Sequence, residues 1–267
     1  MNNRLFKKYF PKKSLGQNFL CDKNVISKIV DFIDPKGEDC LVEIGPGLAA
    51  LTYPISKFVE KLFIIEIDKK LLLYLKDYSF YKKLCIFNMN VLDFDFKQLS
   101  LENHKMLRIF GNIPYNISVK LILFLIKFNN YICDINFMVQ KEVAERLVAI
   151  PGTKFYGRLS IIVQCYYDIS IGFNISPKSF FPIPKIDSTF IYIRPKQIPF
   201  YSSMYLNNLS KITFFAFQKR RKFLKNSLSN LFNQQDLLNL GINPYLRAEN
   251  LSVMEYCKLA NFYEHKK

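Results

Sequence analysis

Short, uninterrupted apolar runs recur along the first half of the chain, and longer segments with apolar residues three or four positions apart separate them. The runs are residues 41–44 (LVEI), 62–67 (LFIIEI), 84–87 (LCIF), 107–110 (LRIF) and 134–139 (DINFMV). Runs of this length are typical of strands buried on both faces of a mostly parallel sheet. The intervening segments, such as 24–33 and 68–75, have helical periodicity. This alternation predicts a doubly wound, Rossmann-like α/β domain.

The pattern changes towards the C-terminus. Residues 156–168 predict an amphipathic helix followed by strand-like sequence, and residues 186–195 (IDSTFIYIRP) alternate as in a late antiparallel strand. The segment KQIPFYSS then resembles a linker, and helical periodicity dominates from Met204 onward. A chain of 267 residues is long enough for two domains. We expect an α/β domain at residues 1–198 and a small helical domain at residues 199–267.

The sequence favours a cytoplasmic protein without a metal. It has no run of about 18 uncharged apolar residues that would predict a membrane helix. Its start, MNNRLFKKYFPKKS, lacks the apolar core of a signal peptide. The six cysteines lie far apart and the only histidines are His104 and His265, so we expect neither zinc nor disulfides, and we interpret the cysteines as small buried hydrophobes.

The net charge of +16 indicates a polyanionic partner, although an A/T-rich genome would also enrich lysine. The charge is concentrated in QKRRKFLKNSL, where the basic residues are Lys219, Arg220, Arg221, Lys222 and Lys225. We predict that a helix carries them as a phosphate-binding surface, anchored by the aromatic residues Phe214, Phe215 and Phe217. Lys7, Lys8, Lys12 and Lys13 are expected to extend it. The alternative is a solvated helix face.

The segment VEIGPGLAALT predicts a strand, a glycine turn and a helix. Gly45 and Gly47 would let the backbone approach a ligand closely, and the following helix would present its N-terminal amides. The next predicted strand ends near Glu66, at the position where an acidic side chain accepts hydrogen bonds from ribose hydroxyls in such folds. An NAD enzyme would share these features.

The segment FGNIPYNIS distinguishes an NAD enzyme from an enzyme that modifies an adenine. In this segment a buried strand ends in Asn112, Ile113, Pro114 and Tyr115. Asn112 and a backbone carbonyl can accept the two amino hydrogens of an adenine while Tyr115 stacks on the base. Such an amine needs no strong base when its lone pair faces an electrophilic methyl group. Pro114 would stiffen the turn.

These motifs resemble those of a known family, the small-subunit ribosomal RNA adenine N6,N6-dimethyltransferases (dimethyladenosine transferases), over nearly the whole chain. The matching segments are KKSLGQNFL, GPGLAALT, NIPY, QKEVAERL, YGRLS, FFPIPKIDS and RAENLSVMEYCKLANF. The resemblance implies S-adenosyl-L-methionine as cofactor and small-subunit ribosomal RNA, within an immature small ribosomal subunit, as substrate.

The resemblance also implies site residues. Those expected to bind the cofactor are Asn18, Leu20, Gly45, Glu66, Asn90 and Asn112. Asn90 is a departure, because the family has an acidic residue at this position. Its side-chain oxygen can still accept from the cofactor's exocyclic amine, but without the negative charge. Asp93 would substitute only if the loop register differs.

The expected catalytic residues are Asn112, Pro114, Tyr115 and Phe180. Asn112 and the Pro114 carbonyl would orient the amino group, Tyr115 would stack on one face of the base, and Phe180 would cover the other. Phe180 and Phe181 have an alternative interpretation as core aromatics, and Phe181 has no match in the family motif.

We therefore expect a monomeric enzyme that dimethylates two adjacent adenosines and acts in ribosome biogenesis. One alternative is a large-subunit adenine methyltransferase of the antibiotic-resistance type, which shares the NIPY and glycine motifs. Another is a non-catalytic ribosome-assembly factor that retains the fold. An NAD dehydrogenase would need a hydride-relay histidine, and neither histidine lies near these motifs.

Overall fold

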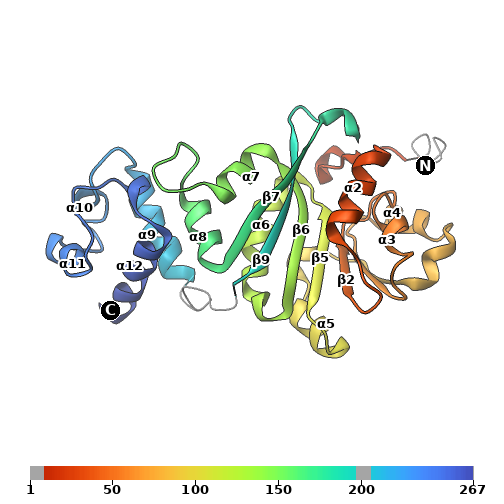
Figure 1. The fold of residues 1–267 in the computed structure, drawn as a ribbon, viewed down its shortest axis with the longest axis horizontal. Coiled ribbons are helices and arrows are strands. Elements are labelled where there is room, and N and C mark those ends of the chain that lie inside the picture. The colour runs from red at the N-terminus through yellow and green to blue at the C-terminus, as the bar shows by residue number, and fades with distance from the viewer. Residues whose placement is uncertain (1–8, 197–205, 267) are drawn as a thin grey trace. The chain divides into compact units, whose positions relative to one another are not determined.

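A computed structural model of the chain describes residues 9–196 and 206–266 (Figure 1). Contacts divide the chain into two compact units, one of residues 1–144 and 170–194 and one of residues 145–169 and 195–267. Residues 145–169 group with the C-terminal segment because helix α8 (Arg158–Tyr166) packs against α9 (Leu206–Gln218) and α12 (Val253–Lys266). The functional division at residue 198 stays a prediction.

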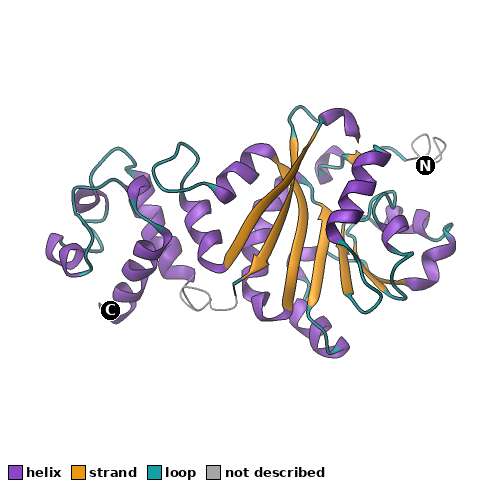
Figure 2. Cartoon of the chain, in the orientation of Figure 1, coloured by secondary structure: helices purple, strands orange, loops and turns teal. Residues whose placement is uncertain are grey.

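The described part of the first unit contains a seven-stranded sheet in the order β4, β3, β2, β5, β6, β9, β7 (Figure 2). The strands are β2 (Cys40–Ile44), β3 (Leu62–Ile65), β4 (Leu84–Phe87), β5 (Leu107–Asn112), β6 (Ile132–Gln140), β7 (Tyr167–Ile175) and β9 (Ser188–Pro195). β4, β3, β2, β5 and β6 are parallel, and β9 pairs antiparallel to β6. The predicted α/β fold is confirmed, and each predicted apolar run overlaps a strand, although the run 62–67 extends two residues past β3.

The central strands of this sheet, such as β2 and β3, are buried on both faces, which explains why their sequences are continuous apolar runs. Leu41 and Val42 point to opposite faces of β2, and both are 0% exposed. Helices flank the sheet on both sides (Figure 2). They are α2 (Lys23–Ile33), α3 (Thr52–Ile55), α4 (Lys69–Leu75), α5 (Phe96–Asn103), α6 (Tyr115–Leu125) and α7 (Lys141–Val148).

The strand order reverses between β2 and β5. From β2 the chain proceeds outward through β3 and β4, whereas β5 and β6 build the sheet in the opposite direction. Ligands of open α/β sheets bind outside the carboxyl ends of the strands at such a switch point. The topology therefore places a binding site where β2, β3 and β5 end.

A two-stranded sheet joins the N-terminal segment to a late segment of the chain. β1 (Phe19–Leu20) pairs antiparallel with β8 (Phe180–Phe181), and Leu20 lies opposite Phe180. Residues 9–20, which we call the N-terminal cap, end in this pairing.

The second unit is helical where it is described beyond residue 205, as predicted. It also contains α10 (Leu224–Ser227) and α11 (Gln234–Asn239). The buried hydroxyl of Tyr156 donates to the Leu251 carbonyl at 2.8 Å. Seven of the eight residues of the predicted linker lie outside the described residues. No helix in the described part of the chain is long and apolar enough to span a membrane.

Candidate active site

A cavity of about 320 Å³ lies at the switch point of the first unit. Its walls come from the N-terminal cap, the ends of β2 and β3, the loop after β4, and the end of β5 with the start of α6. All six predicted cofactor-binding residues line it, namely Asn18, Leu20, Gly45, Glu66, Asn90 and Asn112. Its volume suits a small-molecule ligand.

The glycine turn after β2 has the backbone that only glycine adopts freely. Gly45 has φ +68° and Gly47 has φ +55°, and a Cβ on Gly47 would lie 2.9 Å from the ring of Phe19 in the N-terminal cap. The predicted helix after the glycine turn is present, but it starts late and is short. The chain makes further turns, and α3, which begins at Thr52, has only four residues. Turn residues 45–48 line the cavity, as do Ala50 and Leu51, the N-cap of α3.

Glu66 follows β3 and is 6% exposed. Its Oε1 accepts the main-chain amide of Asp68 at 2.7 Å. Burial, with a smaller effect from the charge of Asp68, raises the pKa of Glu66 to about 7, although backbone hydrogen bonds oppose the shift. The carboxyl is thus fixed at the cavity wall, where it can accept hydrogen bonds from a diol.

Asn112 is the last residue of β5 and lines the same cavity. Its Nδ2 donates to the main-chain carbonyl of Asn18 at 2.7 Å. This bond fixes the orientation of the amide, so that the side-chain oxygen is the group available to accept from a ligand amine.

Pro114 and Tyr115 carry the chain from β5 into α6. Pro114 is the N-cap of α6, and its carbonyl accepts the Ile117 amide at 3.0 Å, which leaves its second lone pair for another donor. The Tyr115 hydroxyl lies 2.6 Å from Ser188 Oγ, which anchors the ring at the cavity. Both residues lie beside Asn112, as the motif predicts.

Asn90, which stands where the family has an acidic residue, already uses its side-chain oxygen in a local hydrogen bond. Asn90 lines the cavity, but its Oδ1 already accepts the Leu92 amide at 3.1 Å as the N-cap of a short 3-10 helix. Asp93 is not among the described residues that line the cavity. The structure therefore gives no support to Asp93 as a substitute acceptor.

Phe180 lies in the core and is 2% exposed, packed in the cluster that includes Leu20. It is not among the described cavity-lining residues. Phe181 is 45% exposed. Stacking of Phe180 on a base stays a prediction.

Two acidic residues that the sequence did not single out lie in the cavity wall or directly behind it. Glu43 in β2 lines the cavity at 2% exposure, and its Oε2 has no hydrogen-bond partner among the described residues. Burial raises the pKa of Glu43 to about 8. Asp68 at the start of α4 binds the N-terminal cap. The segments EIGPG and EID could have pointed to Glu43 and Asp68. Acidic residues seldom occur at the ends of buried strands without a partner.

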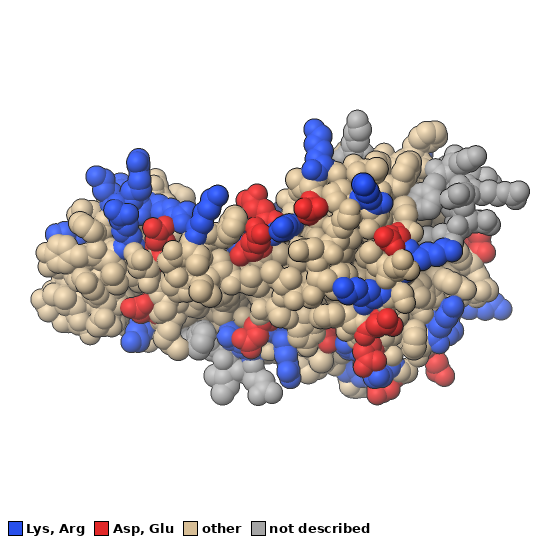
Figure 3. Space-filling model, turned by 45° about the horizontal axis from the view of Figure 1, so that its top comes forward, with Lys and Arg blue, Asp and Glu red and all other residues tan. Residues whose placement is uncertain are grey.

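The basic run lies in the second unit, but the predicted helix does not carry most of it. α9 ends at Gln218, so Lys219, Arg220, Arg221 and Lys222 form an exposed turn, and only Lys225 lies in a helix, the short α10. Five consecutive polar residues offer no apolar side chain to pack against the unit, which ends the helix. Lys and Arg side chains gather on this unit (Figure 3).

The other residues predicted for the basic surface do not all lie free on it. Arg220 pairs with Glu249 at 2.7 Å, and the stacked rings of Phe217 and Tyr256, 6.2 Å apart, anchor α9. Lys7 and Lys8 lie outside the described residues, and Lys12 forms an ion pair with Asp68 at 2.8 Å.

Fold and site together define the class. A cavity at the switch point, lined by a glycine turn, a buried glutamate and an asparagine at the tip of β5, is typical of a Rossmann-like methyltransferase. Two solved structures share this fold. A dimethyladenosine transferase from Plasmodium falciparum has a TM-score of 0.80 and 25% identity, covering 93% of this chain and 98% of that one. The 23S rRNA methyltransferase ErmE has a TM-score of 0.68 at 18% identity, covering 92% and 99%.

Residues 10–265 match the family model described as ribosomal RNA adenine dimethylase, and the chain belongs to this family. Among its relatives is the ribosomal RNA small subunit methyltransferase A of Buchnera aphidicola subsp. Acyrthosiphon pisum, 55% identical over 98% of this chain and 96% of the relative. The protein of the same name from Salmonella choleraesuis is 43% identical over 98% and 96%. The predicted family is confirmed.

Proposed function

We propose that this protein transfers methyl groups from S-adenosyl-L-methionine to N6 of adenosines in small-subunit ribosomal RNA, twice on each of two adjacent bases. The observation that carries the proposal is the hydrogen bond from Asn112 Nδ2 to the Asn18 carbonyl at 2.7 Å. Because this bond commits the amide nitrogen, the Asn112 side-chain oxygen is a fixed acceptor in the cavity that Glu66 also lines.

The cavity residues fit the proposed cofactor. Glu66 can accept both ribose hydroxyls, and the buried Glu43 carboxyl, whose Oε2 has no partner among the described residues, can accept from a cationic group once it is ionised. When bound, the cofactor supplies a methyl group activated by a sulfonium leaving group. The protein then needs to orient the amine and limit water, because this transfer requires no strong base.

The target amine is positioned by acceptors on one loop. Asn112 Oδ1 and the free lone pair of the Pro114 carbonyl accept the two amino hydrogens, and the Tyr115 ring, anchored to Ser188, stacks on the base. After one transfer the amine keeps a lone pair, so a pocket that accommodates one methyl group can act again.

The exposed turn 219–222 supports RNA as the substrate, because clustered Lys and Arg neutralise phosphates. The relatives named as small-subunit methyltransferases favour that subunit over the large one. The proposal includes the immature small subunit as partner, a monomeric enzyme and the cytoplasm as its compartment.

Purified, undermethylated small and large ribosomal subunits test the proposal directly. We expect methyl incorporation into the small subunit, with dimethyladenosine detected by mass spectrometry of its digested RNA. Incorporation into the large subunit alone would favour the resistance-type enzyme. Absence of both transfer and cofactor binding would favour an assembly factor.

A further inference from the structure

We propose that Asp68 is a positioning residue, whose carboxylate holds the N-terminal cap in place as a wall of the cofactor cavity. The inference rests on the proposed function, since it assigns a role at that same cavity. Asp68 itself is not among the described residues that line the cavity, and it would act through the cap.

One oxygen of Asp68 collects three donors from the cap. Its Oδ2 lies 2.5 Å from the Tyr9 hydroxyl, 2.8 Å from Lys12 Nζ and 3.3 Å from Gln17 Nε2. Gln17 reinforces the cluster, because its Oε1 accepts the Lys12 main-chain amide at 2.8 Å. Three side chains of one segment thus converge on a single carboxylate of another.

The other oxygen has a separate task. Asp68 Oδ1 accepts the Lys70 amide at 3.0 Å and caps α4. The side chain is 1% exposed, so its charge is poorly screened by water. Burial opposes ionisation, but the hydrogen bonds from Lys12 and Tyr9 outweigh it and hold the pKa of Asp68 below its usual value. The carboxylate is therefore charged when it binds the cap.

The cap contacts both the glycine turn and Asn112 at the cavity. Phe19 packs edge-on against Tyr9 with ring centroids 5.7 Å apart and covers Gly47, where a Cβ would lie 2.9 Å from it. The adjacent Asn18 carbonyl holds Asn112. Loosening the cap would therefore disturb the glycine turn and the acceptor amide together.

The substitution Asp68→Asn separates the two tasks, because the amide oxygen can still cap α4, whereas the amide nitrogen that replaces Oδ2 cannot accept from the three cap donors. We expect S-adenosylhomocysteine, the unreactive product, to bind on the order of tenfold more weakly by calorimetry, the equivalent of one charge-assisted hydrogen bond. In methylation assays KM for the cofactor should rise more than kcat falls. Tyr9→Phe should show a smaller loss in the same direction. The matched control is Asp95→Asn, which changes the N-cap of α5 and should leave binding unchanged.

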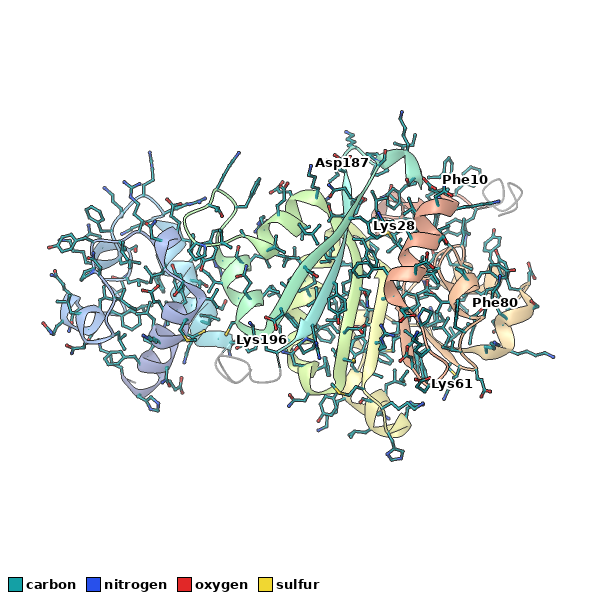
Figure 4. The ribbon with its side chains drawn as sticks, in the orientation of Figure 1. Phe10, Lys28, Lys61, Phe80, Asp187 and Lys196 are labelled. Atoms are coloured by element: carbon teal, nitrogen blue, oxygen red, sulfur yellow. The ribbon has the colours of Figure 1, made fainter. Side chains whose placement is uncertain are left out.

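A second readout needs no ligand. The chain has no tryptophan, so Phe10→Trp, at a position 87% exposed on the cap (Figure 4), gives a single fluorescent reporter. In that background Asp68→Asn should lower the fluorescence anisotropy at a temperature below the melting transition of both proteins. If Asp68→Asn does not fold, Tyr9→Phe carries both measurements.

The outcomes separate the two proposals. Unchanged product affinity in a folded Asp68→Asn protein would overturn the role of Asp68, as would a loss of affinity at unchanged anisotropy. If the unaltered protein does not bind S-adenosylhomocysteine, the proposed function fails instead, and the anisotropy comparison still decides whether Asp68 holds the cap.

Discussion

At the scale of single residues, Asn112 has a role that its surroundings make specific. Its amide nitrogen is committed to the Asn18 carbonyl, so Asn112→Ala removes an oriented acceptor without removing a core side chain. We expect the variant to fold and kcat to fall on the order of 100-fold or more, the usual cost of a misplaced reacting group. Single-turnover methylation measures this.

The control for that variant is Asn103→Ala, at the end of α5, where the side chain donates to the Leu99 carbonyl and not to a cavity residue. It should methylate at the normal rate. Turnover near that of the unaltered protein in Asn112→Ala would contradict the orienting role of Asn112.

Glu66 makes cofactor binding depend on pH. Burial raises the pKa of Glu66 to about 7, so a large fraction of the ligand-free protein has a neutral carboxyl at pH 6. The ionised form accepts stronger hydrogen bonds from ribose hydroxyls, so binding favours the loss of this proton. Affinity for S-adenosylhomocysteine should therefore rise between pH 6 and pH 8, by roughly tenfold, and level off above that.

Calorimetry in buffers of different ionisation enthalpy checks the sign, because binding at pH 6.5 should release protons. Glu66→Gln should bind more weakly at pH 8 and lose the pH dependence between pH 6 and pH 7, and the dependence that remains near pH 8 belongs to Glu43. Proton uptake on binding, or an unchanged slope in Glu66→Gln, would rule out this assignment.

Motif spacing found the residues that touch the ligand cavity but not those that support them. Asn18, Glu66 and Asn112 stand in recognisable segments, and all three line the cavity. Asp68 escaped notice because its donors Tyr9 and Lys12 are more than fifty residues away, and only the tertiary structure brings them together. The burial of Phe180 likewise depends on its pairing with Leu20.

At the scale of elements, the sequence predicted the strands well, but it predicted the short helix α3 and the turn at 219–222 less well. A strand such as β2 is buried on both faces, so composition alone defines it. The four residues of α3 and the turn at 219–222 are decided by local packing, which leaves little periodicity in the sequence. Helical periodicity from Met204 onward predicted a helix through the basic run, but α9 ends at Gln218, before its cations.

Arg108 of β5 ties together elements that the sequence did not link. Its Nε donates to Asp134 of β6 at 2.9 Å, and its guanidinium also binds Asp39 at 2.6 Å and the Ile33 carbonyl at the end of α2 at 2.6 Å. Asp134 has a side chain only 5% exposed. Arg108→Met should lower the free energy of unfolding by about 3 to 5 kcal/mol, because it leaves a buried carboxylate without its counter-charge.

Urea denaturation measures this loss. The double substitution Arg108→Met with Asp134→Asn should be more stable than Arg108→Met alone, because it also removes the uncompensated charge. Additive losses would show that packing, not charge, accounts for the effect.

At the scale of the whole molecule, the sheet topology explains why residues from distant segments form one site. The switch between β2 and β5 brings the carboxyl ends of β2, β3 and β5 to one edge, and the N-terminal cap completes the cavity. The alternation of runs predicted this edge. It could not predict that residues 145–169 pack with the C-terminal helices, because that depends on contacts between α8, α9 and α12.

If the exposed turn 219–222 binds RNA phosphates as proposed, binding should depend on salt in a measurable way. Each phosphate neutralised releases condensed counterions, so log K for the RNA should fall linearly with log salt. Arg221→Ala with Lys222→Ala removes two cations from the exposed turn and should reduce the magnitude of that slope by about 1 to 2 while weakening binding to any RNA sequence. Fluorescence titration of a small-subunit RNA fragment between 50 and 300 mM KCl, about the range in which such effects are large, measures the slope.

The matched control is Lys36→Ala with Lys105→Ala, two lysines that precede β2 and β5 and so lie at the sheet edge opposite the cavity. An equal change of slope in both double variants would mean that total charge, and not the turn, governs RNA binding.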